Sequence, residues 1–197
     1  MSWLASWREA RVLRSFKKIG TGCKVTGINI EVKGKVTLGN NCIIRGNVVL
    51  RTHKQGHITL GNGVEISDYA LFQVNDEVII GDNTYIGPFV VARDTNHLFQ
   101  GTDIHWRLTP HITEPIRIGK NCFIGANSYL MPGVTIGDGA LISPGSIINR
   151  NIGPGEVWGG SPAHKIAHRT DEAQRPKRKR EFDLISMYGF IPEEGEV

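Results

Sequence analysis

The chain has 197 residues, of which 40% are hydrophobic, a size and composition that suit one main domain with a packed core and small appendages. No apolar run approaches the ~20 residues of a membrane span. The first residues also lack the basic-then-apolar order of a signal peptide. We therefore expect a cytoplasmic protein without a transmembrane segment.

The formal net charge is +4, and much of the basic excess lies near the C-terminus. The basic cluster consists of Lys165, His168, Arg169, Arg175, Lys177, Arg178, Lys179 and Arg180. Nucleic-acid binding is one interpretation of such a cluster. A solvated helix or an anion site is the commoner one, and we expect no nucleic-acid partner.

The N-terminal segment, residues 1–18, is expected to form a capping helix. Trp3, Trp7 and either Ala10 or Arg11 follow a three-to-four spacing, which predicts an amphipathic helix over residues 2–18. Its apolar side would cover the open end of the repeats that follow, since a terminal repeat must be covered.

Aliphatic residues recur at every sixth position in the second half of the chain, at Ile118, Ile124, Leu130, Ile136, Ile142 and Ile148. Three earlier blocks keep the same spacing: Leu38, Ile44, Leu50; then Leu60, Ile66, Phe72; then Ile80, Ile86, Ala92. A helix repeats every 3.6 residues and a strand every 2, so a period of six predicts short strands joined by tight corners. We expect an all-β parallel β-helix of about six to seven coils over residues 19–152, with three hexapeptides per coil. A β-sandwich is the alternative, but its turns come every ~8–12 residues.

The corners and the cysteines fit this pattern. Gly, Asn and Asp recur where a corner needs positive φ or a capped turn. Cys23, Cys42 and Cys122 all lie four residues after an aliphatic position, where a small inward side chain is needed. This placement favours core packing over a disulfide, a metal site or a thiol nucleophile.

The repeat is interrupted most strongly between about residues 93 and 115, where twenty extra residues are inserted. Smaller insertions add four residues around 51–56 and two between Leu60 and Ile80. A solenoid accommodates an insertion as a loop at a corner, and such loops commonly carry function. The long loop holds Asp94, Asn96, His97, His105, Trp106, Arg107 and His111.

The last part of the chain, residues 153–197, is expected to close the prism and then leave it. Gly and Pro end the repeat over residues 153–166. A basic segment, read as helical as far as Arg175, and an alternating apolar and acidic tail over 181–197 follow. The sequence leaves open whether this tail packs on a neighbouring subunit.

The run from Ile116 to Ile166, with its closing Gly-Ser-Pro-Ala, resembles the C-terminal half of hexapeptide-repeat acyltransferases. The resemblance extends over about residues 19–168 and is strongest to maltose, galactoside and polysaccharide O-acetyltransferases. It implies a left-handed β-helix, an exception to the usual right-handed crossover. It also implies a homotrimer with active sites between adjacent prisms, acetyl-CoA as co-substrate, and no metal.

The resemblance places a catalytic histidine at the start of the inserted loop, where this chain has His97. Histidine suits general-base catalysis near neutral pH. Asp94 is a candidate to orient the imidazole, and a backbone carbonyl would serve equally well. His105 and His111 are interpreted as surface or acceptor contacts rather than catalytic groups.

The remaining site residues follow from the same resemblance. The expected acceptor-binding residues are Asp68, Tyr69, Asn75, Asn96 and Trp106. The expected coenzyme-binding residues are Phe123, Gly125, Ala126, Ser143, Pro144, Asn149 and Arg150. Arg150 stands where the family usually has Lys and keeps a cation for phosphate, whereas Pro144 removes an N–H donor.

These residues together predict an acetyltransferase that acts on a sugar hydroxyl in cell-envelope or exopolysaccharide biosynthesis. N-acetylation of a nucleotide-linked amino sugar is an alternative, because it needs the same base and donor. A non-catalytic scaffold of the same fold is a further alternative. A γ-class carbonic anhydrase is disfavoured, because it needs two histidines five residues apart on a strand, and His105 and His111 are six apart in a loop.

Overall fold

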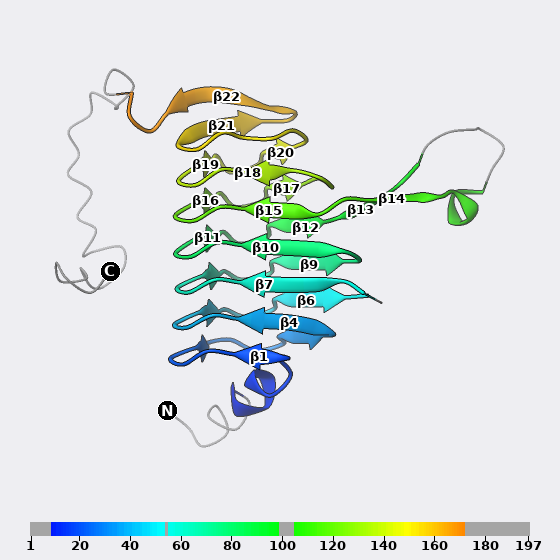
Figure 1. Ribbon diagram of the computed structural model, residues 1–197, viewed down its shortest axis with the longest axis vertical. Helices are drawn as coiled ribbons and strands as arrows, with labels where there is room; N and C mark the ends of the chain where they lie inside the picture. The colour runs from blue at the N-terminus through cyan, green and yellow to red at the C-terminus, as the bar shows by residue number, and fades with distance from the viewer. Residues whose placement is uncertain (1–8, 54, 99–104, 172–197) are drawn as a thin grey trace.

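The computed structural model describes residues 9–53, 55–98 and 105–171 of the chain. It is a three-sided prism of stacked coils with a β-arm at one corner (Figure 1). The first and third sheets contain six parallel strands each, and the second contains eight. The chain therefore completes six coils before the second sheet continues into a closing hairpin. This confirms the predicted parallel β-helix; its left-handed turn stays an expectation from the resemblance.

Each coil contributes one strand to each sheet. The first sheet contains β1 (Lys18–Ile19), β4 (Lys35–Leu38), β7 (His57–Leu60), β10 (Glu77–Ile80), β15 (Ile116–Ile118) and β18 (Thr135–Ile136). The second contains β2 (Lys24–Val25), β5 (Ile43–Ile44), β8 (Glu65–Ile66), β11 (Tyr85–Ile86), β16 (Phe123–Ile124), β19 (Leu141–Ile142), β21 (Glu156–Gly160) and β22 (Ala163–His168). The third contains β3 (Glu31–Lys33), β6 (Val49–Thr52), β9 (Leu71–Val74), β12 (Val91–Arg93), β17 (Tyr129–Leu130) and β20 (Ile147–Ile148).

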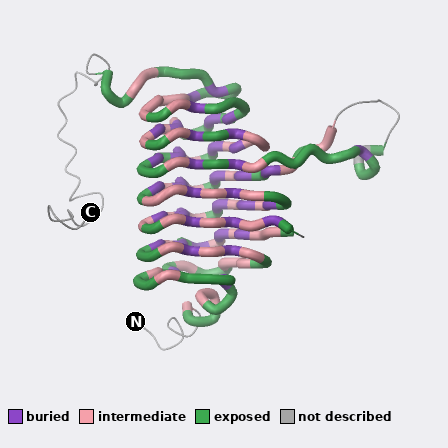
Figure 2. The backbone as a smooth tube through the Cα atoms, in the orientation of Figure 1, coloured by how far each residue is buried: buried purple, intermediate pink, exposed green. Residues whose placement is uncertain are grey.

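The six-residue repeat is the register of these sheets. In the second sheet, Ile44, Ile66, Ile86, Ile124 and Ile142 stand directly above one another. All five are fully buried. Because side chains alternate across a strand, the residue before each of them points outward. Figure 2 shows the result, buried positions alternating with more exposed ones along every coil.

Asparagine and aspartate side chains tie the corners of successive coils together. Asn62 Oδ1 accepts the N–H of Asn40 at 2.8 Å, and Asp82 Oδ1 accepts the N–H of Asn62 at 2.8 Å. Asn41, Asn83 and Asn121 adopt positive φ, which Asn tolerates better than most residues. The predicted use of Asn and Asp at corners is therefore confirmed.

The cysteines lie where the repeat predicted them. Cys42 and Cys122 are buried in the core, and Cys23 is partly buried near the N-terminal end. Burial raises the pKa of the Cys42 thiol to about 11, so this side chain stays a neutral packing group.

The two ends of the prism are closed differently. Residues 9–13 are helical, and Phe16 covers the first coil with 7% of its surface exposed. The helix is shorter than expected, because the Lys17 N–H donates to the Val36 carbonyl at 2.9 Å and the chain enters the first sheet. Trp3 and Trp7 lie outside the described residues.

At the other end, β21 and β22 form an antiparallel hairpin, so the basic segment begins as a strand rather than a helix. Hydrogen bonds from Lys165, Trp158 and the Gly153 N–H lower the pKa of Glu156 to about 2. Glu156 therefore remains ionised at neutral pH and holds the hairpin on the last coil. Residues 172–197, which include the predicted tail, lie outside the described part.

The inserted loop leaves the prism between β12 and β15 as an antiparallel arm. It contains β13 (Thr95–His97), a short 3-10 helix η1 (Trp106–Leu108) and β14 (His111–Thr113). Most of the described arm is exposed (Figure 2). In Figure 1 it extends sideways, away from the axis of the coils.

We predict opposite outcomes for two neighbouring residues of β10. Ile80 points inward and is 1% exposed, whereas Ile79 is partly exposed on the outer face. Ile80→Ala should lower the free energy of unfolding by about 2–5 kcal/mol, since it leaves a cavity. Ile79→Ala should cost less than about 1 kcal/mol. Denaturant unfolding of both variants tests this, and the reverse order would mean that the strand is shifted by one residue.

Candidate functional site

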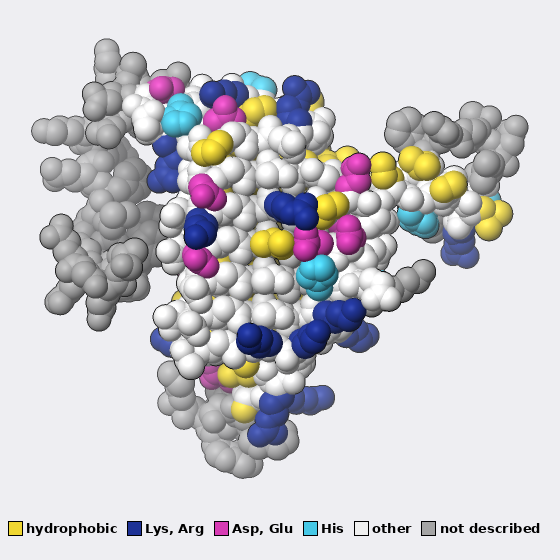
Figure 3. Space-filling model, in the orientation of Figure 1, with side chains coloured by type: hydrophobic (Ala, Val, Ile, Leu, Met, Phe, Trp, Pro, Cys, Tyr) yellow, Lys and Arg dark blue, Asp and Glu magenta, His cyan; other side chains and the backbone are white. Residues whose placement is uncertain are grey.

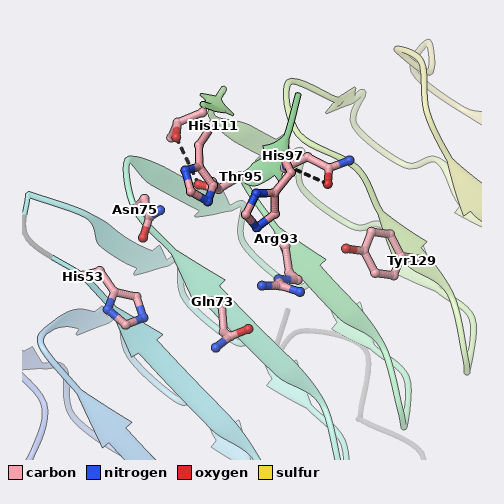
Figure 4. Close-up of a pocket in the computed structure, with 10 residues that line it drawn as sticks. His53, Gln73, Asn75, Arg93, Thr95, His97, His111 and Tyr129 are labelled. Carbon is pink, nitrogen blue, oxygen red and sulfur yellow. Dashed lines mark hydrogen bonds between the residues drawn. The ribbon is translucent and has the colours of Figure 1, made fainter. Parts of the chain in front are cut away.

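A groove of about 720 Å³ lies where the arm meets the outer face of the third sheet. Figure 4 shows its lining side chains. They come from β9, β12, β13, β14, β17 and the corner after β6, and comprise His53, Gln73, Asn75, Arg93, Thr95, Asn96, His97, His111, Thr113 and Tyr129. The groove therefore combines the rigid face of the prism with the base of the inserted arm.

His97 stands on β13, opposite His111 on β14. The two rings lie 4.1 Å apart between centroids and are tilted by 47°. His97 Nδ1 lies 2.9 Å from the Thr109 hydroxyl. A hydrogen bond at one ring nitrogen fixes the orientation of the imidazole and selects its tautomer. The ring of His97 points into the groove in Figure 4.

Asp94 is fully buried at the point where β12 passes into the arm. Its carboxylate accepts the N–H groups of Asn75 and Asp76 at 2.7–3.0 Å and the Thr95 hydroxyl at 3.0 Å. In the described part of the chain, no hydrogen bond joins Asp94 to His97. The contact at His97 Nδ1 comes from Thr109 instead. Asp94 therefore fixes the base of the arm, a role different from the expected one of orienting the imidazole.

The expected acceptor residues divide into two places. Asn75 and Asn96 line the groove. Asp68 and Tyr69 do not: Asp68 accepts the Gly46 N–H at 3.0 Å, and Tyr69 stacks on Phe89 at another corner. Trp106 lies in η1, and its side chain is outside what the structure describes.

The expected coenzyme residues also separate within one chain. Phe123 is 39% exposed on the second sheet and stacks on Tyr85 with 5.2 Å between ring centroids. Gly125, Ala126, Ser143 and Pro144 follow at the corner between the second and third sheets. Gly125 is needed for coil packing there, because a Cβ would lie 2.5 Å from the Pro144 nitrogen. Asn149 and Arg150 are exposed after β20, at the corner from which the arm leaves two coils earlier.

Several groove residues were missed from the sequence. Gln73, Arg93 and Tyr129 each stand next to an inward residue of the six-residue repeat, namely Phe72, Ala92 and Leu130. Their outward direction was readable from the strand alternation. Thr109 and His53 lie in irregular segments, and no periodic signal marked them.

Comparison with known proteins agrees with the geometry. Residues 115–150 match the family described as the hexapeptide repeat of succinyl-transferase. The chain is therefore a hexapeptide-repeat protein. It is 38% identical over 97 residues to the galactoside O-acetyltransferase of Escherichia coli, covering 48% of this chain and 45% of that protein.

Two further similarities extend over more of this hexapeptide-repeat chain. A putative lipopolysaccharide biosynthesis O-acetyl transferase of Escherichia coli, WbbJ, is 27% identical over 70% of this chain and 74% of its own length. The crystal structure of AntD, an N-acyltransferase from Bacillus cereus, superposes with a TM-score of 0.69 at 20% identity. It covers 83% of this chain and 90% of that one, which shows a shared fold. The chain spans about half the length of several curated relatives that it matches.

Two findings concern the described residues alone. They contain no group of three or more His, Cys, Asp and Glu side chains arranged to hold a metal ion. They also contain no helix with the length and apolar character needed to cross a bilayer.

We expect Asp94→Ala to loosen the base of the arm. The substitution leaves two partly buried N–H groups without their acceptor, at a cost of about 1–3 kcal/mol. Hydrogen exchange at the Asn75 and Asp76 amides should become faster, and thermal unfolding should begin earlier. Asp138→Ala is the matched control, because this exposed carboxylate accepts a single N–H, that of Lys120. Unchanged stability together with lost turnover would instead support the role of Asp94 as a catalytic partner of His97.

Proposed function

We propose that this chain is an acetyl-CoA-dependent acetyltransferase that acetylates a sugar hydroxyl, with His97 as the general base. The proposed setting is cell-envelope or exopolysaccharide biosynthesis in the cytoplasm. The observation that supports it best is the position of His97, held through Nδ1 at the edge of a groove rich in amide and hydroxyl groups. Such a lining suits the hydroxyls of a sugar.

The reaction follows from this arrangement. The imidazole of His97 takes the proton from the acceptor hydroxyl as its oxygen attacks the thioester carbonyl carbon. The carbon–sulfur bond then breaks, the acetyl group remains on the acceptor oxygen, and coenzyme A leaves as a thiol once its sulfur has gained a proton. A sugar amine would react through the same steps, so N-acetylation remains the alternative within this proposal.

His111 has a supporting part in the proposed chemistry. Two imidazoles at 4.1 Å disfavour each other's protonation, because like charges at short distance repel. A neutral His97 is the form that accepts a proton. The His97–His111 pair therefore favours the protonation state that a general base needs.

We also propose that the active unit is a homotrimer. The outer faces of the prism differ in a way that supports this. The first sheet presents charged partners, with Glu77 paired to both His57 and Arg117. Basic, acidic and histidine side chains lie side by side over this sheet in Figure 3. Such a face is suited to water.

The second and third sheets present apolar rows instead. Tyr85, Phe123, Leu141 and Val157 follow one another outward on the second sheet. Val49, Leu71, Val91, Tyr129 and Ile147 do so on the third. All are partly or fully exposed in the single chain. Contiguous exposed apolar rows of this kind mark interaction surfaces.

A trimer would also unite groups that one chain separates. The groove with His97 lies on the third sheet, whereas Phe123 and the corner with Ala126 and Pro144 lie on and beside the second. Packing the third sheet of one copy near the second sheet of the next would bring the base toward the expected coenzyme residues.

His97→Ala should lower turnover by ~10²–10⁴-fold with the fold retained, because a neutral hydroxyl is a poor nucleophile without a base. Thiol release from acetyl-CoA with a panel of sugar acceptors measures this. His57→Ala is the matched control, since His57 lies on the first sheet, away from the groove. Near-normal turnover in a well-folded His97→Ala protein would remove the assignment of the base.

Sedimentation equilibrium should give a mass three times that of the 21.8 kDa chain. Leu71→Lys, on the third sheet, should shift the protein toward the monomer, because a desolvated ammonium is costly at an apolar interface. Thr59→Lys occupies the middle of the first sheet and should leave the mass unchanged. A wild-type monomer, or equal effects of both variants, would contradict the proposed interface.

A further inference from the structure

The groove beside His97 has an uneven charge. Its ten lining residues include one arginine and three histidines but neither aspartate nor glutamate. The nearest acid in the chain, Asp94, is buried and already accepts hydrogen bonds from the backbone and Thr95. A groove lined in this way favours a negatively charged ligand over a neutral one.

Arg93 is the source of that charge. It ends β12 and lies beside Gln73 of β9 in the register of the third sheet. Its side chain is exposed and extends into the groove below His97 (Figure 4). Among the residues that the structure describes, its guanidinium forms neither a hydrogen bond nor an ion pair.

The other strand arginines in the described part behave differently. Arg51, two strands away in the same sheet, donates two hydrogen bonds to Glu31 at 2.7 and 2.9 Å. Arg117, in the first sheet, pairs with Glu77. A carboxylate is thus supplied wherever an arginine serves the surface of the prism. The arginine in the groove is the one left available for a ligand.

We propose that Arg93 binds an anionic group of the acceptor, a phosphate or a carboxylate. This inference rests on the proposed acetyltransferase function and deepens it, since it narrows the acceptor to a phosphorylated, nucleotide-linked or acidic sugar. The planar guanidinium holds two oxygens of such a group at once. Gln73 and Asn75, on the same wall, offer amide groups beside it. The hydroxyl to be acetylated would then reach His97.

Equilibrium binding tests this without any need for turnover. Isothermal calorimetry is performed with glucose, glucose 1-phosphate, UDP-glucose and glucuronic acid. We expect at least one anionic sugar to bind more than about 10-fold tighter than glucose, as one charge-assisted pair contributes. A preference for the two phosphorylated ligands identifies phosphate as the bound group, and a preference for glucuronic acid identifies carboxylate.

Arg93→Gln should remove this preference, and Arg93→Lys should retain only part of it, because lysine lacks the two-pronged geometry. Arg51→Gln is the matched control, since it removes a guanidinium from the same sheet outside the groove. The inference is overturned if every anionic sugar binds no tighter than glucose, or if Arg93→Gln binds them as the wild type does.

Two further readouts separate other roles for Arg93. Weaker binding of acetyl-CoA to Arg93→Gln, with sugar binding unchanged, would place the residue on the donor side and overturn the inference. A fall in oligomer mass would assign it to a subunit contact with the same consequence. Failure of the acetyltransferase proposal itself appears elsewhere, as the absence of thiol release with every acceptor.

Discussion

The structure depends on one constraint: each coil can bury its inward aliphatic residues only against the coils above and below it. Ile86 packs between Ile66 and Ile124 in an unbroken parallel register, and the same holds in the other two sheets. A chain built in this way cannot absorb extra residues inside a coil without exposing a layer of the core. Additional residues must leave at a corner, which is why the inserted segment forms an arm rather than a bulge in a sheet.

The same constraint explains how a loop becomes a site. The arm begins immediately after β12, whose register is set by the core, so the first residues of the arm inherit the precision of the sheet. Asp94 transmits this by binding the N–H groups of Asn75 and Asp76 in the preceding coil. His97, three residues further on, is held by the β13–β14 pairing and by Thr109. Rigid support beneath a short arm gives a mobile class of structure a fixed catalytic geometry.

The sequence predicted the parts of this molecule that repeat. The inward stacks, the corners, the buried Cys42 and Cys122 and the place of the insertion all follow from a period of six, since every coil obeys the same packing rule. The site was less predictable because it breaks the period. His97, Asn75 and Asn96 were found, but Asp94 was given the wrong partner, because which group meets an imidazole depends on how an irregular loop folds back. Arg93 was missed although its outward direction was implied by its neighbour Ala92, since nothing local distinguishes an unpaired arginine from one that meets a carboxylate on the next coil.

Two corner residues depart from the rule that the other corners follow. Asn47 and Asn127 occupy this corner in the second and fifth coils with positive φ, as expected of asparagine. In the two coils between them the residues are Tyr69 and Phe89, at φ 62° and 58°, a conformation that bulky side chains rarely adopt. Their rings stack with centroids 4.8 Å apart, yet 52% and 49% of their surfaces remain exposed. Stacking returns about 0.5–1.5 kcal/mol, which at most matches the strain of two left-handed residues at about 1–2 kcal/mol each. Stability of the single chain therefore does not account for aromatic residues at this edge. The edge joins the two apolar faces of the prism, and burial of these rings against a neighbouring copy would supply the missing free energy, which links the strained corner to the proposed trimer.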